Sequence, residues 1–320
     1  MKKRILAVLI ATALAVSVTG CAGNATSSSD STSASSVAES SDTSTQTSAD
    51  ASSEDESKEE SSQEESKDLE ANYTKYTLDG DLTQHMIDMS RLNEGNKVRL
   101  ANVIKKLKNG EEVTVGFIGG SITQGTSAGN DLCYAKLTAD WLQQTYSNAK
   151  INYVNAGIGA TGSYIGVHRV ENDLLSKKPD LVFVEFSVND TTENTERNKK
   201  SYDGLLRTIW KSSTNPAIIT IATTQEDGTS FQDQHAEIVK HYDLPMISYR
   251  NTILDTIKHG DIVWKDISDD NIHPNVPGHK IVSQLLQAYI SDVDKDVDNI
   301  SGSESDFTTP ATDAPIENGS

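Results

Sequence analysis

The sequence predicts an α/β protein, a three-layer α/β/α sandwich around a central, mainly parallel sheet of five strands. Two observations carry this prediction. Short runs of consecutive apolar residues, typical of strands buried on both faces, alternate with longer segments whose apolar residues recur at helical spacing. The alternation extends over about residues 73–291, which is a suitable length for one domain with a substantial core.

The first half of this region begins with an amphipathic segment, residues 96–109, which predicts a helix that ends at Gly110. Residues 113–118 are almost all apolar and glycines follow them, so they predict a buried strand. Residues 133–146 place their large apolar side chains on one helical face, and residues 151–155 predict the next strand.

The second half repeats the alternation. A helical pattern over residues 164–175 is broken at Pro179, and the apolar run 181–186 predicts a third strand. The remaining expected elements alternate in the same way: a helix around 205–210, a strand over 217–222, a helix over 236–241, a strand over 245–249 and a helix over 278–290. In an open sheet of this kind, ligands bind beyond the carboxyl ends of the strands.

The N-terminus has the features of a secretory signal over residues 1–21: basic residues, an apolar run and then small residues. The apolar run is too short to span a bilayer. The segment Val18-Thr19-Gly20-Cys21 resembles the lipobox of bacterial lipoproteins, which implies that Cys21 is lipidated. A lipid there would anchor an exported protein to the outer face of the cell membrane. Ordinary secretion without a lipid is the alternative.

Two segments have compositions that predict disorder. Residues 22–72 are mostly Ser, Thr, Asp and Glu, which is typical of an extended linker, and residues 292–320 are a similar acidic tail. These segments carry nearly all of the formal net charge of −19, so the domain between them is only mildly acidic. No basic stripe is present, which argues against nucleic acid as a partner. The domain is expected to be a monomer.

Polar residues whose side chains can act together chemically lie after predicted strands or before the final helix. Ser121 comes directly after the first strand, and Asn189 comes after the third. Asp270 and His273 precede the final helix. A serine hydroxyl becomes a nucleophile when an imidazole removes its proton, and a carboxylate fixes the tautomer of that imidazole. Asp269 is a rival to Asp270, and only the spacing of three residues favours the latter.

Donors for a tetrahedral oxyanion are also available at this end of the sheet. The side-chain amide of Asn189 can donate, as can main-chain N–H groups of Ser121 and of the glycine-rich turn after the second strand. Asp190 is interpreted as structural. Cys133 falls in the apolar pattern of a helix, which indicates a small core residue. No cluster of metal-binding residue types has the spacing of a known site, so neither a metal nor a cofactor is expected.

Four separated blocks resemble those of the SGNH hydrolases, the GDSL esterase/lipase family, whose sheet is flavodoxin-like. The blocks are Gly119-Gly120-Ser121-Ile122, residues 155–160, Val188-Asn189-Asp190 and residues 270–273. The resemblance implies that Ser121 is the nucleophile, Asn189 an oxyanion donor, and Asp270 and His273 the rest of the triad. Gly120 stands where the family often has aspartate.

One position departs from that family's pattern. Ala160 falls where the resemblance implies a glycine that donates its main-chain N–H to the oxyanion, and Gly159 is its rival. Alanine can serve unless the turn requires a positive φ.

Other interpretations compete with a serine hydrolase. Ser121 could be only a helix N-cap. Residues 157–162 match the G-x-G-x-x-G motif of dinucleotide-binding domains, although a complete strand and helix precede them. A non-catalytic carbohydrate-binding surface module is a third class, which the loss of the oxyanion glycine favours.

The sequence therefore predicts a serine esterase that acts outside the cell, most simply on acetyl groups of polysaccharides. A lipid-ester or thioester hydrolase and an acyltransferase are alternatives within the same fold. Trp264 and Tyr164, which lie near the motifs in the sequence, are candidates for stacking on sugar rings.

Overall fold

The computed structural model describes residues 73–191 and 194–317. The predicted signal with Cys21 and the predicted linker lie outside the described residues. Within the described ranges, none of the helices combines the length and the apolar content that crossing a membrane requires.

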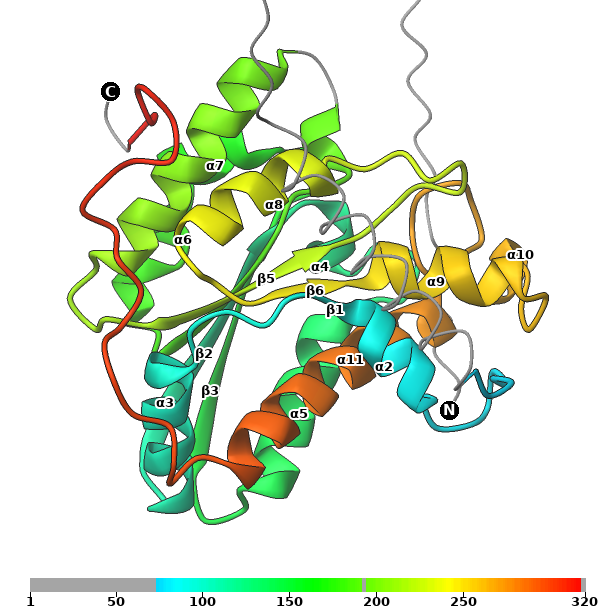
Figure 1. Ribbon diagram of the computed structural model, residues 1–320, viewed down its shortest axis with the longest axis horizontal. Helices are drawn as coiled ribbons and strands as arrows, with labels where there is room; N and C mark the ends of the chain where they lie inside the picture. The colour runs from blue at the N-terminus through cyan, green and yellow to red at the C-terminus, as the bar shows by residue number, and fades with distance from the viewer. Residues whose placement is uncertain (1–72, 192–193, 318–320) are drawn as a thin grey trace, which may run out of the picture. The chain divides into compact units, whose positions relative to one another are not determined.

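A central sheet has the strand order β1-β6-β5-β4-β2-β3 (Figure 1). Neighbouring strands from β6 to β3 run parallel, whereas β1 pairs antiparallel with β6 at one edge. The prediction of a mainly parallel sheet is confirmed, with six strands rather than five. The edge strand β1 was missed because it is only three residues long and half-buried. The strands are β1 Arg91–Asn93, β2 Glu112–Gly119, β3 Lys150–Gly157, β4 Leu181–Glu185, β5 Ala217–Ala222 and β6 Met246–Ser248.

Helices cover both faces of the sheet, and the sheet separates two hydrophobic cores. Residues of α3, α5, α9 and α11 belong to one core, and residues of α6, α7 and α8 belong to the other. The helices are α2 Gln84–Ser90, α3 Val98–Lys108, α4 Ser121–Gln124, α5 Tyr134–Thr145, α6 Ser163–Asp173, α7 Thr195–Trp210, α8 Gln232–His241, α9 Tyr249–Lys258, α10 Trp264–Ile267 and α11 Val276–Lys295, with 3-10 turns η1 Leu175–Lys177 and η2 Asn189–Thr191.

Strand β4 shows why the strands are apolar without alternation. Leu181 and Phe183 face one core, whereas Val182 and Val184 face the other, and all four are buried. A strand covered on both faces has no solvent side, so every position favours an apolar residue.

The prediction of a disordered tail from residue 292 is wrong for residues 292–317. Helix α11 continues to Lys295, and the segment that follows runs along the helices of the second core (Figure 1). Phe307 stacks on Trp210 and Tyr242, with ring centroids 4.5 and 3.9 Å away. The buried carboxylate of Asp203 accepts hydrogen bonds of 2.7 Å from both the N–H and the hydroxyl of Thr312. Composition missed this because a few well-placed contacts, rather than a high average hydrophobicity, order the segment.

Candidate active site

Ser121 is the first residue of α4 and follows β2, which lies between β3 and β4 in the sheet. The parallel register aligns the end of β2 at Gly119 with Gly157 on β3 and Glu185 on β4. The ends of three strands therefore open at one edge, and the serine lies at the middle one.

His273 and Asp270 lie in the loop between α10 and α11, about 150 residues further along the chain. The Nε2 of His273 is 2.9 Å from the Oγ of Ser121, across a sequence separation of 152 residues. Its Nδ1 is 2.8 Å from Oδ2 of Asp270. The structure thus brings the three residues predicted as a triad into one hydrogen-bonded chain, in the order that proton transfer from the serine requires.

The second oxygen of Asp270 holds the loop in shape. Oδ1 accepts hydrogen bonds of 2.7 Å from the main-chain N–H groups of both Ile272 and His273. Partial burial works to raise the pKa of Asp270, but the hydrogen bonds from His273 and Ile272 outweigh it and keep this pKa below its usual value. The carboxylate is therefore charged at neutral pH. Asp270, and not the exposed Asp269, has these contacts.

Two side chains beneath the loop fix the position of Asp270. The indole N–H of Trp264 donates a 2.6 Å hydrogen bond to the carbonyl oxygen of Asp270. The hydroxyl of Ser268 lies 2.8 Å from the same oxygen and 2.6 Å from the carbonyl oxygen of His273. Trp264 is only 7% exposed, so the hypothesis that it stacks on a sugar ring is wrong.

The ring of Tyr164 is already partly covered. The guanidinium group of Arg197 lies over it at 4.7 Å from the centroid, and the ring of His168 meets it edge-on at 5.1 Å. The structure gives no support to sugar stacking on this tyrosine.

Asn189 begins η2, the first helical turn after β4, and its side chain lies against Gly120. A Cβ atom at position 120 would come within 1.9 Å of the Asn189 Oδ1. Any side chain there would displace the amide, so Gly120 makes room for Asn189 beside Ser121.

The turn after β3 lies on the other side of the nucleophile. A Cβ atom built on Gly159 would be 3.8 Å from the Cβ of Ser121. The N–H of Gly159 donates a 2.8 Å hydrogen bond to Oε1 of Gln124, so this group is already engaged. Ala160 adopts a φ of 57°, the left-handed region that an alanine enters at a cost of about 1–2 kcal/mol. The turn thus has the conformation that glycine would adopt without strain.

A buried network joins the Asn189 turn to the segment after Ala160. Oδ1 of Asp190 accepts a 2.8 Å hydrogen bond from the N–H of Ser163 at the start of α6, and its Oδ2 lies 2.9 Å from Nε2 of His235. The side-chain amide of Asn198 donates to the carbonyl oxygen of Asp190. Asp190, as predicted, is structural. The role of His235 was missed, because nothing in the local sequence around α8 indicates that its side chain reaches η2.

His279, near the start of α11, is buried and lies outside the triad. Its Nδ1 accepts a 3.1 Å hydrogen bond from the N–H of Tyr134. Burial lowers the pKa of His279 to about 4, and the nearby His273 adds to this effect. The ring is therefore neutral near pH 7.

A cavity of about 360 Å³ lies close to α4, the short helix that Ser121 begins. It lies beside α4 and the end of β3, where Gln124 and Gly157 form part of its wall. The other lining residues are Asn130, Tyr153 and Asn155.

Comparison with known proteins identifies a family. Residues 117–281 match the model of the GDSL-like lipase/acylhydrolase family. Comparison with the curated proteins gave no match. An acetylxylan esterase from Geobacillus stearothermophilus, Axe2, is 20% identical with a TM-score of 0.47, over 56% of this chain and 94% of its own.

Two crystal structures of a two-domain esterase (CEX) active on acetylated mannans are more similar. The structure with mannopentaose is 38% identical with a TM-score of 0.66, and the alignment covers 71% of this chain and 60% of that chain. The second structure of this esterase is 38% identical with a TM-score of 0.68, and the alignment covers 71% of this chain and 61% of that chain. This chain thus spans about three fifths of the length of that esterase. Since the family model covers more than half of the sequence, the chain belongs to the GDSL-like lipase/acylhydrolase family.

Proposed function

We propose that this protein is a serine esterase that removes acetyl groups from polysaccharides outside the cell, with Ser121 as nucleophile. The observation that carries the proposal is the continuous chain of contacts from the Ser121 hydroxyl through His273 to Asp270.

The geometry supports a two-step acyl transfer. His273 Nε2 takes the proton of the Ser121 hydroxyl as its Oγ attacks the ester carbonyl carbon. The tetrahedral intermediate collapses, and His273 returns the proton to the leaving sugar oxygen. Water then attacks the carbonyl carbon of the acetyl-serine, with His273 as base. The second tetrahedral intermediate breaks its bond to Ser121 Oγ, which takes the proton back from His273, and acetic acid leaves. Asp270 holds the Nδ1 proton and stabilises the imidazolium that forms in each step.

The oxyanion requires donors close to Ser121. Asn189 supplies the side-chain amide, and the turn after β3 supplies the main-chain N–H of Ala160. Gly159 is the weaker candidate because its N–H is bonded to Gln124. The main-chain N–H of Ser121, at the first position of α4, has no acceptor within its own helix and completes the set.

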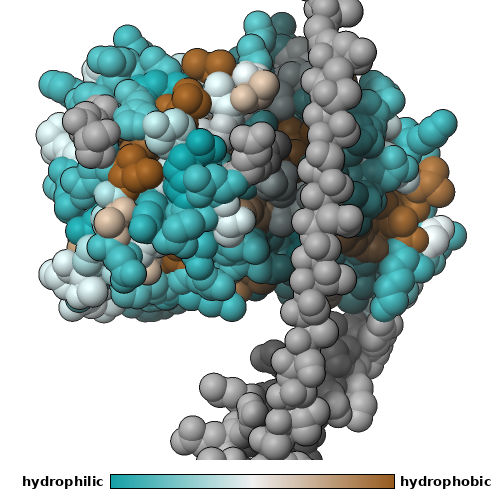
Figure 2. All heavy atoms as spheres, turned by 90° about the horizontal axis from the view of Figure 1, so that it is seen from above, coloured by the Kyte–Doolittle hydropathy of each residue, from teal (hydrophilic) through white to brown (hydrophobic). Residues whose placement is uncertain are grey.

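An acetylated carbohydrate is favoured as substrate by two observations. The relative with 38% identity is described as active on acetylated mannans. On the parts of the face in Figure 2 that grey atoms do not cover, most of the surface is hydrophilic, which suits contact with a polymer rich in hydroxyl groups.

Export and anchoring are part of the proposal and rest on the pattern of residues 1–21. Cys21 carries the lipid, and residues 22–72 form the tether. Metabolic labelling with an alkyne fatty acid should mark the wild-type protein, whereas Cys21→Ser should be unlabelled and released into the medium. Labelling of the variant would reject Cys21 as the anchor.

Substrate class is tested with a panel of acetylated mannan, acetylated xylan and p-nitrophenyl esters of increasing acyl length. We expect acetate release from the glycans and rates that fall as the acyl chain lengthens. Rates that rise with acyl length would favour a lipid esterase. Transfer of acetyl to an added alcohol in preference to water would favour an acyltransferase.

Catalysis itself is tested with a fluorophosphonate probe. The wild-type protein should form one adduct at Ser121, and Ser121→Ala should form none and lose turnover. A folded wild-type protein without an adduct would favour a non-catalytic binding module.

A further inference from the structure

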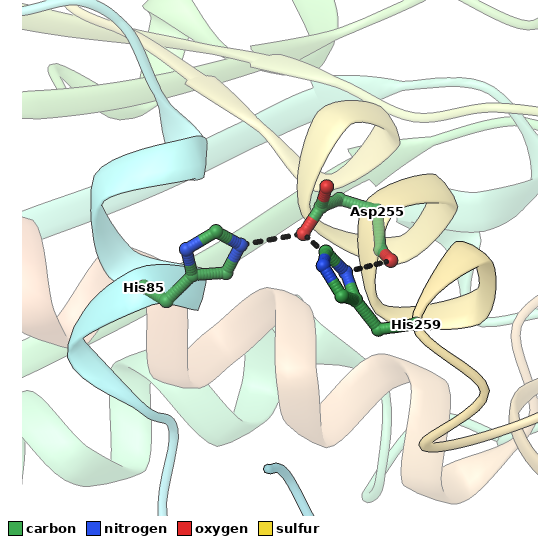
Figure 3. Close-up of side chains that lie close together, drawn as sticks. All are labelled: His85, Asp255 and His259. Atoms are coloured by element: carbon green, nitrogen blue, oxygen red, sulfur yellow. Dashed lines mark hydrogen bonds and ion pairs between the residues drawn. The ribbon is translucent and has the colours of Figure 1, made fainter. Parts of the chain in front are cut away.

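A second cluster of chemically active side chains lies outside the triad, between α2 and α9 (Figure 3). His85 comes from the first turn of α2, and Asp255 and His259 come from α9 and its C-terminal cap. The spacing of four residues places Asp255 and His259 on the same helical face. The cluster therefore joins two elements that are about 170 residues apart in the sequence.

The side chains converge on one carboxylate oxygen. Oδ2 of Asp255 lies 2.6 Å from Nε2 of His85 and 3.3 Å from Nδ1 of His259. The His85 side chain is 3% exposed, that of Asp255 12% and that of His259 17%. The group is largely shielded from water, yet it remains reachable from the His259 side.

The set of donors is that of a transition-metal site. Two imidazoles and one carboxylate suit Zn²⁺ and similar divalent ions, whereas Ca²⁺ and Mg²⁺ prefer more oxygen ligands. The ligand atoms of the three residues all lie within 4.8 Å of one another. We infer that His85, Asp255 and His259 form a site for a divalent transition-metal ion, of which Zn²⁺ fits best.

The distances require only a small adjustment. Two ligand atoms bound tetrahedrally at 2.0–2.2 Å from zinc are about 3.3–3.5 Å apart. The His259–Asp255 pair is already at 3.3 Å, and the His85–Asp255 pair must widen from 2.6 Å by less than 1 Å. Each imidazole then presents a lone pair to the ion and carries its proton on the other nitrogen. His259 Nδ1 exchanges its 2.9 Å contact with the Asp255 carbonyl for the ion.

Neighbouring groups hold the ligands in place. The ring of Tyr73 stacks on that of His259, with 4.1 Å between centroids and an interplanar angle of 17°. The hydroxyl of Thr252 on α9 donates to the carbonyl oxygen of Met86 on α2, next to His85. Three protein ligands leave a fourth position for water. The ion would clamp α2, the first helix that the structure describes, onto α9.

The test uses the full chain after treatment with a chelator. Calorimetric titration with Zn²⁺ should give one ion per chain and a rise in the unfolding temperature, because the ion binds the folded state. Co²⁺ added to the wild-type protein should produce the visible absorption of a four- or five-coordinate site, and this measurement does not depend on any variant. His85→Ala and His259→Ala should each weaken Zn²⁺ binding more than tenfold.

Two controls make the result specific. His241→Ala removes an exposed histidine outside the cluster and should leave Zn²⁺ binding unchanged. His273→Ala removes the triad imidazole, which could bind Zn²⁺ together with Asp270, and should also keep the site. Asp255→Asn retains the shape of the side chain and serves if His85→Ala fails to fold. No binding by the folded wild-type protein, or full binding by folded His259→Ala and Asp255→Asn, would show a hydrogen-bonded cluster only and overturn the inference.

Discussion

Replacing Asp270 with asparagine tests the triad with little change in shape. In the structure, Oδ1 of Asp270 accepts two main-chain N–H bonds and Oδ2 faces Nδ1 of His273. Asparagine would keep its oxygen on the two N–H groups and turn its NH₂ toward His273. Two donors cannot face each other, so Nδ1 must release its proton and Nε2 must hold one. His273 would then present an N–H to Ser121 instead of a lone pair.

The size of the effect follows from the loss of the general base. The equivalent substitution in a serine protease lowers kcat about 10⁴-fold. We expect a loss of about 10³–10⁴-fold here, which corresponds to about 4–5.5 kcal/mol in the activation free energy. The unfolding temperature should change little, since both main-chain hydrogen bonds of the loop remain.

The assay is the initial rate of acetate release from acetylated mannan near neutral pH, with thermal unfolding measured on the same samples. Asp269→Asn is the matched control, because it removes the same charge one residue earlier from an exposed side chain without contact to His273. If Asp270→Asn kept more than about a tenth of the wild-type rate, or if the two variants were equally impaired, the role given to Asp270 would be refuted.

Four further predictions concern other residues of the site and of the fold. Asn189→Ala should lower kcat about 10²–10³-fold with a small effect on KM, measured on acetylated mannan, because it removes an oxyanion donor; an effect on KM alone would contradict this. Ala160→Gly should stabilise the protein by about 0.5–1 kcal/mol in urea unfolding. The substitution relieves about 1–2 kcal/mol of backbone strain, which exceeds the cost of about 0.4–1 kcal/mol from the entropy that glycine adds to the unfolded chain. A loss of stability would refute strain at this turn. Folding lowers the pKa of His279 from about 6.5 to about 4, so the unfolded chain binds this proton more tightly than the folded protein. Protonation therefore favours unfolding, and the free energy of unfolding should fall by about 2 kcal/mol between pH 7.5 and pH 5. His279→Gln should flatten this pH dependence in urea unfolding, and an unchanged slope would disprove it. Phe307→Ala should lower the free energy of unfolding by about 3–5 kcal/mol in the same assay, because it removes the ring that stacks on Trp210 and Tyr242. An unchanged free energy of unfolding would favour the disordered tail that the composition predicts.

A buried network links the candidate oxyanion donors to the core. Asp190 contacts the first residue of α6 and His235 of α8, so it joins the Asn189 turn to the segment after Ala160. These groups are buried, and their bonds cross between elements that are far apart in the sequence. Rigid support of this kind keeps donors in position before the substrate binds, which is the condition for electrostatic stabilisation of a transition state.

Local sequence patterns were enough to predict the mainly parallel sheet and the candidate reacting groups. Strands such as β4 are buried on both faces, so their apolar runs are visible without any knowledge of their neighbours. Ser121 and Asn189 follow such runs, and Asp270 and His273 are close enough in the sequence to pair through one local loop. These features depend on interactions within a few residues, which a linear pattern records.

The remaining features could not be predicted from local patterns, because their energies depend on which residues distant in the sequence come into contact. Asn189 defines the space beside Gly120, and the turn that packs against α4 sets the positive φ of Ala160. The aromatic rings around Phe307 order the tail. The cluster of His85 with Asp255 and His259 was invisible for the same reason. Its ligands come from α2 and α9, and no spacing along the chain indicates that these two helices lie side by side.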